Sequence, residues 1–282
     1  MKLGDSEIKV VLDSGVLGLD GLGYFPERLA ILTGELRPRE LAAISKTVTF
    51  GPHAGNFRWW KPWESIRYLG NGNYVNTYGL TNPGIVKASK ALGRFCSRVD
   101  VPIISVALPA PEQAAKLVEA VHSIRPRPRA IELNISCPNV EQAPLDSLVD
   151  SVGEIRVATK LPLIIKLGYD QDFISILDRL YFVHDVAHLI NSVRFSTVFS
   201  GKPSPLKGGG GVSGPIIFEF AVNAVEALRM SDYGKPIIGG GGIDSVDKAK
   251  TMLNVGADAI AIGTATHTRP YLPNHIKNVL AS

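Results

Sequence analysis

Cysteine is scarce in this sequence, whose 282 residues include only Cys96 and Cys137. Two thiols cannot build the multiple bridges of a disulfide-stabilised scaffold, and they are too few to hold an iron–sulfur cluster. Any such cluster therefore has to lie on a partner chain. The scarcity is typical of a protein in a reducing compartment, so we expect a cytoplasmic location.

Long apolar stretches are missing too. The sequence contains no run of about 18 apolar residues, the length that a membrane-spanning helix needs. Residues 1–11 carry charges throughout and lack the apolar centre of a signal peptide or a membrane anchor. We therefore expect no association with a membrane.

A strong excess of one charge is also absent, because the net charge is only +4. The one local basic run, Arg125, Arg127 and Arg129, fits either a nucleic-acid contact or a solvated loop. The lack of interleaved aromatic residues favours the loop. The six histidines show no spacing typical of metal ligands. We expect neither a nucleic acid nor a metal ion as a partner.

Short apolar runs alternate with longer helical patterns along the whole chain. Nearly continuous apolar runs are typical of parallel strands that are buried on both faces. The expected strands are residues 8–12, 41–46, 102–106, 130–134, 163–166, 188–193, 236–239 and 259–262. The helices expected between them include 111–124, 145–159, 172–183, 215–229 and 245–255, the last capped at its start by Asp244 or Ser245. Eight such strands predict a (β/α)8 barrel.

Two segments exceed what a minimal barrel needs. Residues 51–82 are rich in Trp, Tyr, Gly and Asn, and residues 195–211 are rich in Gly, Ser, Pro and Lys. Each follows the end of an expected strand, where barrel enzymes carry their active-site loops. We expect residues 1–282 to form a single domain with long loops at the carboxyl face of the barrel.

Glycines gather at the ends of the last two expected strands, as Gly241-Gly242 and Gly263-Thr264, with Gly214 before a helix. Such glycines either make tight turns or let backbone N–H groups approach an anion. The position after the seventh and eighth strands favours a phosphate site. Many barrel isomerases and synthases share this feature, so it predicts a phosphate and nothing more specific.

Two lysines stand at strand ends. Lys166 closes the apolar run 163–166, and Lys46 closes the run 41–46. A lysine in the barrel mouth can stabilise the reduced ring of a bound flavin, form a Schiff base as in barrel aldolases, or extend to solvent. The position at the end of an apolar strand favours the two functional interpretations over a lysine that extends to solvent.

The segment 132–139 places Cys137 between Asn134 and Asn139, with a proline beside it. A lone cysteine is most often a small buried apolar residue. Here the polar neighbours and the position after a strand favour a catalytic base. Asparagine is disfavoured in strands, so Asn134 and Asn191, together with Asn76, point to the recognition of a polar ring.

These motifs resemble the dihydroorotate dehydrogenase family over most of the chain. The matching segments are Asn134 to Asn139, Lys46-Thr47, Asn76 to Asn82, Lys166, Gly241-Gly242 and Gly263-Thr264. The resemblance implies FMN as the cofactor, held by Ser14, Lys46, Thr47, Asn76, Asn134, Lys166, Val193, Gly214, Gly241, Gly242, Gly263 and Thr264. It implies a substrate site formed by Lys46, Asn76, Tyr78, Gly79, Leu80, Asn134, Asn139 and Arg194.

The implied reaction is the oxidation of dihydroorotate to orotate in pyrimidine biosynthesis. Cys137 acts as the base, with Lys166 and Lys46 as the other catalytic residues, and a hydride passes to FMN N5. A cysteine base is the mark of the soluble class of the family. The resemblance also implies a homodimer. If NAD is the acceptor, it implies an iron–sulfur flavoprotein partner; fumarate would need none.

Two residues depart from the family pattern. Arg194 replaces a neutral residue, where an arginine either clamps a carboxylate or blocks the ring edge. Asp13 replaces an alanine, and an inward-pointing carboxylate there would destabilise an anionic reduced flavin. The departures leave open a related FMN oxidoreductase acting on another dihydropyrimidine-like substrate. The Schiff-base interpretation of Lys166 leaves open a phosphate-binding aldolase or isomerase. A non-catalytic flavin-binding or phosphate-binding protein is the third alternative.

Overall fold

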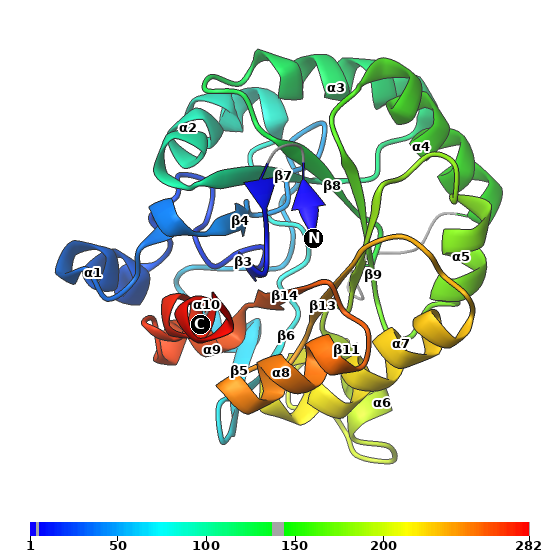
Figure 1. Ribbon diagram of the computed structural model, residues 1–282. Coiled ribbons are helices and arrows are strands. Elements are labelled where there is room, and N and C mark those ends of the chain that lie inside the picture. The colour runs from blue at the N-terminus through cyan, green and yellow to red at the C-terminus, as the bar shows by residue number, and fades with distance from the viewer. Residues whose placement is uncertain (4–5, 137–143, 282) are drawn as a thin grey trace.

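Eight short parallel strands close into a barrel, with helices packed around its outside (Figure 1). A computed structural model describes residues 1–3, 6–136 and 144–281 of the chain. The order around the barrel is β10-β13-β14-β3-β4-β7-β8-β9, so the first and last barrel strands are neighbours. The predicted (β/α)8 barrel is confirmed.

The barrel strands follow the apolar runs of the sequence closely. They are β3 (Val10–Leu12), β4 (Ala42–Ile44), β7 (Val101–Ala107), β8 (Ala130–Asn134), β9 (Leu163–Leu167), β10 (Val186–Leu189), β13 (Ile237–Gly240) and β14 (Ala259–Ile262).

The predicted strand 188–193 is wrong in its bounds, because β10 begins two residues earlier and ends at Leu189. The backbone N–H groups of Ile190 and Asn191 still bond to Gly240 and Leu167 on the two flanking strands. Val193 then pairs in a different sheet. The predicted strand therefore spans residues of two different sheets, the barrel and a second sheet that contains Val193. Its apolar pattern does not mark where one sheet ends and the other begins.

The helices form a ring around the strands (Figure 1). They are α1 (Phe25–Thr33), α2 (Ile85–Arg98), α3 (Ala114–Ser123), α4 (Leu145–Ala158), α5 (Phe173–Arg179), α6 (Phe195–Val198), α7 (Phe218–Met230), α8 (Val246–Asn254), α9 (Thr264–Thr268) and α10 (Leu272–Ala281). Ser245 caps α8 as predicted, accepting a hydrogen bond from the Lys248 amide. The predicted helix 172–183 is too long, because α5 ends at Arg179. None of the helices in these ranges is long and apolar enough to cross a bilayer.

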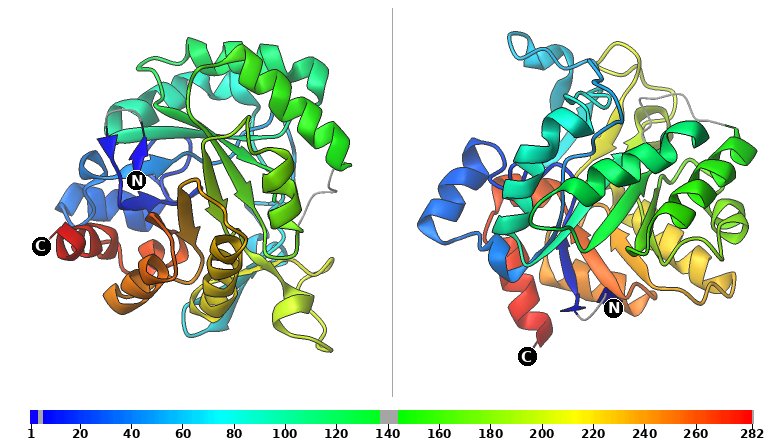
Figure 2. Two further views of the ribbon diagram at one scale, coloured as in Figure 1. Left: turned by 45° about the vertical axis from the view of Figure 1, so that its right-hand side comes forward. Right: turned by 90° about the horizontal axis from the view of Figure 1, so that it is seen from above.

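The first long segment and the two strands that flank the second form a small antiparallel sheet at the barrel mouth, β11-β12-β6-β5. Its strands are β5 (Ile66–Gly70), β6 (Asn73–Asn76), β11 (Val193–Arg194) and β12 (Gly211–Ser213). Loops alone were expected there. Figure 2 shows this sheet at the end of the barrel opposite the N-terminal antiparallel pair of β1 (Lys2–Leu3) and β2 (Ser6–Glu7).

Successive side chains along each barrel strand point alternately into the barrel and out toward the helices. The inward-pointing side chains of the eight strands therefore form layers. Ile164 belongs to an apolar cluster inside the barrel, whereas Ile165 packs outward against the helices. The inner cluster includes Leu3 and Ile8 and closes the end of the barrel where the strands begin. The residue two positions after Ile164 is Lys166, so the next inner layer is polar and lies toward the mouth.

Candidate active site

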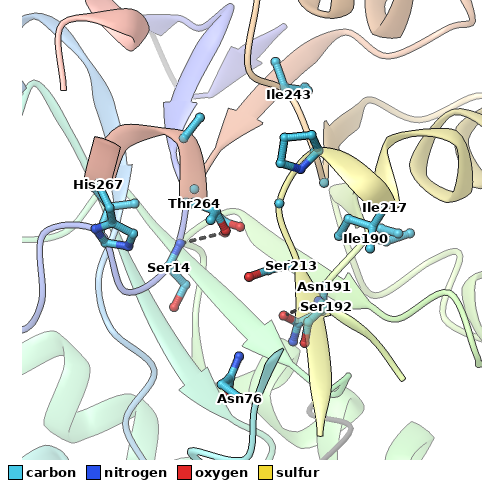
Figure 3. A pocket seen from close by; sticks show the side chains of 18 of the residues that line it. Ser14, Asn76, Ile190, Asn191, Ser192, Ser213, Ile217, Ile243, Thr264 and His267 are labelled. Carbon is cyan, nitrogen blue, oxygen red and sulfur yellow. Dashed lines mark hydrogen bonds between the residues drawn. The ribbon is translucent and has the colours of Figure 1, made fainter. Parts of the chain in front are cut away.

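A cavity of about 240 Å³ opens at the carboxyl ends of the barrel strands, beneath the mouth sheet (Figure 3). Figure 3 shows Asn76, Asn191 and Thr264 around one space, each from a different part of the chain. The lining residues named by the sequence prediction are Ser14, Asn76, Tyr78, Gly79, Gly214, Gly241, Gly242, Gly263 and Thr264. Segments distant in sequence thus converge on one site.

The glycines form a wall of closely packed backbone. At Gly242 the backbone has φ +72°, and an added Cβ would lie 2.7 Å from the Phe218 amide nitrogen. At Gly214 φ is +106°, and a Cβ would lie 2.4 Å from the Gly72 carbonyl oxygen. Only glycine fits either position, so the loops after β13 and before α7 can reach the cavity as bare backbone.

A chain of hydrogen bonds runs beneath the cavity. The Asn191 amide donates to Ser136 Oγ at 3.0 Å, and Ser136 donates to Asn134 Oδ1 at 3.0 Å. Asn134 in turn donates to Thr47 Oγ1 at 3.1 Å, and the Thr47 hydroxyl lies 2.9 Å from Ser105. These bonds fix the orientation of two asparagines that strand propensity alone disfavours.

The same series of hydrogen bonds continues from Ser105 to two ionisable side chains. Ser105 Oγ donates to Glu132 Oε1 at 2.8 Å, and the other Glu132 oxygen lies 2.7 Å from His188 Nδ1. Glu132 and His188 are fully buried. Sequence reasoning assigned neither to the site, although a charged or imidazole side chain inside an apolar parallel strand was the available signal.

Lys166 forms an ion pair with Asp13, at 2.5 Å between Nζ and Oδ1. Burial alone would raise the pKa of Asp13, but the attraction of Lys166 and then of His188 outweighs it, so this pKa lies below its ordinary value. Burial alone would lower the pKa of Lys166, but the attraction of Asp13 and then of Glu132 outweighs it, so this pKa is raised. Both groups are therefore charged at neutral pH.

Four further residues that the sequence predicts for the site do not line the cavity themselves. The Lys46 ammonium stands 5.4 Å from the centre of the Tyr78 ring, which lines the cavity. Val193 is buried in β11, and Leu80 does not line the cavity. Arg194 is exposed and borders a separate hollow, so the structure does not bring it to the cavity.

Two predicted site residues, Cys137 and Asn139, lie outside the described residues. His267 and Asp244 line the cavity and were missed, because neither belongs to a recognisable motif. Within the part of the chain that the structure describes, no three His, Cys, Asp or Glu side chains are placed to hold a metal ion.

A closed parallel barrel with a glycine-lined cavity at the carboxyl ends of its strands defines the class of (β/α)8-barrel enzymes. The chain belongs to the dihydroorotate dehydrogenase family, because the sequence model of that family matches residues 40–282. The family resemblance of the sequence motifs is thereby confirmed.

Known relatives agree with this assignment. A protein of Desulforudis audaxviator is 33% identical over 240 residues, which are 81% of this chain and 76% of the relative. One of Listeria monocytogenes is 31% identical over 244 residues, 83% and 78% of the two chains. One of Halalkalibacterium halodurans is 30% identical over 245 residues, 82% and 77%. All three are named dihydroorotate dehydrogenase B (NAD(+)), catalytic subunit.

Proposed function

We propose that this chain oxidises dihydroorotate to orotate in pyrimidine biosynthesis, with FMN bound in the cavity at the barrel mouth. Membership of the family supports the reaction. The observation that carries the proposal is the convergence of Gly214, Gly241, Gly242, Gly263 and Thr264 with Asn76 in one cavity.

The groups around the cavity suit the parts of FMN. Backbone N–H groups after β13 and β14, with the Thr264 hydroxyl, suit the phosphate. The amides of Asn76 and Asn191 both donate and accept, which suits the edges of a planar polar ring. When bound, FMN supplies the acceptor for the two electrons that leave the substrate as hydride.

The protein itself binds, orients and moves a proton. Asn76, Asn134 and Asn139 orient the substrate ring, and the hydrogen bond to Thr47 holds Asn134 in place. Cys137 removes the proton from C5 of the substrate at its Sγ atom. Positioning the substrate flat against the cofactor supplies much of the rate enhancement.

A Schiff-base aldolase is disfavoured by the state of Lys166. A nucleophilic lysine needs a lowered pKa, whereas the pairing with Asp13 raises it. Borohydride would therefore leave Lys166 unmodified in the presence of a carbonyl substrate.

The electron acceptor and the assembly complete the proposal. The relatives are named as catalytic subunits of NAD(+)-linked enzymes, which supports NAD as the final acceptor here. The chain has only two cysteines, so an iron–sulfur flavoprotein subunit would carry the electrons onward. We propose a homodimer of the catalytic chain as the core of this complex, located in the cytoplasm.

The test is the visible spectrum of the purified protein during anaerobic addition of dihydroorotate. We expect a yellow protein that bleaches on addition. Cys137→Ala should stay yellow but bleach roughly 100-fold or more slowly, the usual scale of general base catalysis. Cys96→Ala, in the buried face of α2, is the matched control and should bleach at the wild-type rate. A colourless protein that FMN does not reconstitute would sink the proposal.

A further inference from the structure

Four ionisable side chains occupy the polar layer between the apolar interior of the barrel and the cavity. Asp13 follows β3, and Glu132, Lys166 and His188 lie on β8, β9 and β10. Three of them are at most 2% exposed, whereas the Asp13 side chain is 19% exposed and lines the cavity. Of the four, Asp13 is the one that meets a bound molecule.

The four groups form two close contacts that face each other. Lys166 forms an ion pair with Asp13 at 2.5 Å, and His188 Nδ1 lies 2.7 Å from a Glu132 carboxylate oxygen. The second imidazole nitrogen, His188 Nε2, lies 4.0 Å from Asp13 Oδ1 and has no hydrogen-bond partner among the described residues. The positive charge of Lys166 is thus paired with the Asp13 carboxylate, which lies between the ammonium and the cavity.

We propose that Asp13 is a positioning residue that holds Lys166 and cancels its charge at the floor of the cavity. The bound flavin then meets a neutral pair in place of a lone cation. This inference rests on the proposed function, because it concerns FMN in that cavity.

The consequence is a lower reduction potential of the bound flavin. Reduction adds negative charge to the flavin ring, and a nearby cation favours the reduced form. A carboxylate beside that cation removes most of this stabilisation. Charges act strongly on each other in this layer because it is nearly closed to water.

The test is the reduction potential of FMN in the holoenzyme, measured by equilibration with a reference dye. In Asp13→Asn the Lys166 ammonium loses the carboxylate on its cavity side. We expect at least a tenfold rise in the ratio of reduced to oxidised flavin at a fixed potential, about 30 mV for a two-electron couple. Asp13→Glu keeps the charge and should stay within about threefold of the wild type.

Two further variants make the result specific. Asp170→Asn removes the same charge from an exposed residue outside the cavity and should leave the potential within about threefold of the wild type. Adding Lys166→Met to Asp13→Asn removes the cation as well, so the potential should return toward the wild-type value. A structural role of Asp13 alone would not produce this reversal.

An unchanged or lowered potential in Asp13→Asn that still holds FMN would overturn the inference. If that variant does not fold, Asp13→Ser carries the same expectation, because its hydroxyl can still accept a hydrogen bond from the ammonium. Failure of the wild type to bind FMN would instead overturn the proposed function.

Discussion

His184 is a histidine that the fold keeps neutral. Its Nδ1–H donates to the Leu180 carbonyl, and its Nε2 accepts from the Tyr233 hydroxyl at 2.6 Å. Burial lowers the pKa of His184 to about 4, from an ordinary value of 6.5. Below pH 6.5 the unfolded chain therefore binds a proton that the folded chain does not, and stability falls as the pH falls toward 4.

We predict that this one group costs about 2 kcal/mol of unfolding free energy between pH 6.5 and pH 5. Urea unfolding at pH 7 and pH 5 measures the loss. His184→Gln should reduce it by that amount, while His275→Gln, at an exposed position on α10, should keep it in full. Equal losses in the two variants would count against the assignment.

Other relations at the residue scale could not be predicted from the sequence. Asp13 and Lys166 are 153 positions apart, and nothing in either local segment signals the other. Glu132 and His188, 56 positions apart, show the same limitation. The motif residues were easier to identify, because Gly241, Gly242, Gly263 and Thr264 follow the pattern of glycines after the last two strands that phosphate-binding barrels share.

At the scale of elements, the barrel strands could be predicted from the pattern of apolar residues, but the strands of the mouth sheet could not. The strand 130–134 was predicted with its correct bounds because its residues are all buried and mostly apolar. The strands of the mouth sheet are two to five residues long, and Gly211 pairs with the distant Asn76. The hairpin turn Asn71-Gly72, with φ values of +51° and +77°, was the one local signal that the sequence offered.

A comparison of two neighbouring glycines tests the role of this sheet. Gly209 and Gly210 both have positive φ, so alanine at either should cost about 1 kcal/mol or more of backbone strain. A Cβ on Gly209 meets nothing within 4 Å, whereas one on Gly210 would lie 2.7 Å from the Asn76 carbonyl oxygen.

Gly210→Ala should therefore displace Asn76 from the cavity. We expect the dissociation constant of FMN to rise about tenfold or more, equivalent to about 1.4 kcal/mol. Gly209→Ala, the control, should stay within about threefold of the wild type. Fluorescence titration of FMN into the apoprotein measures both, and equal effects would show that the sheet does not position the site.

At the scale of the whole molecule, the proposed function gives this chain one half of an electron path. It places a flavin in the cavity, and two cysteines cannot supply an iron–sulfur relay. We predict that the isolated chain transfers electrons from dihydroorotate to a soluble dye but not to NAD. Addition of an iron–sulfur flavoprotein subunit should establish NAD reduction, followed by absorbance of the reduced nicotinamide. Direct reduction of NAD by the chain alone, at the rate seen with the dye, would rule out the partner.

The closure of the barrel sets the order of events during synthesis. β14 pairs with β3, and the Asp13 amide donates to the Ile262 carbonyl at 3.0 Å, so the floor of the cavity joins the first barrel strand to the last. A ribosome that has translated as far as β13 has not yet made the loop carrying Gly263 and Thr264. Under the proposed function, FMN can be bound only after this loop has been made. A chain truncated after β13 would lack one wall of the cavity, and β3, without its partner strand, would be an open sheet edge.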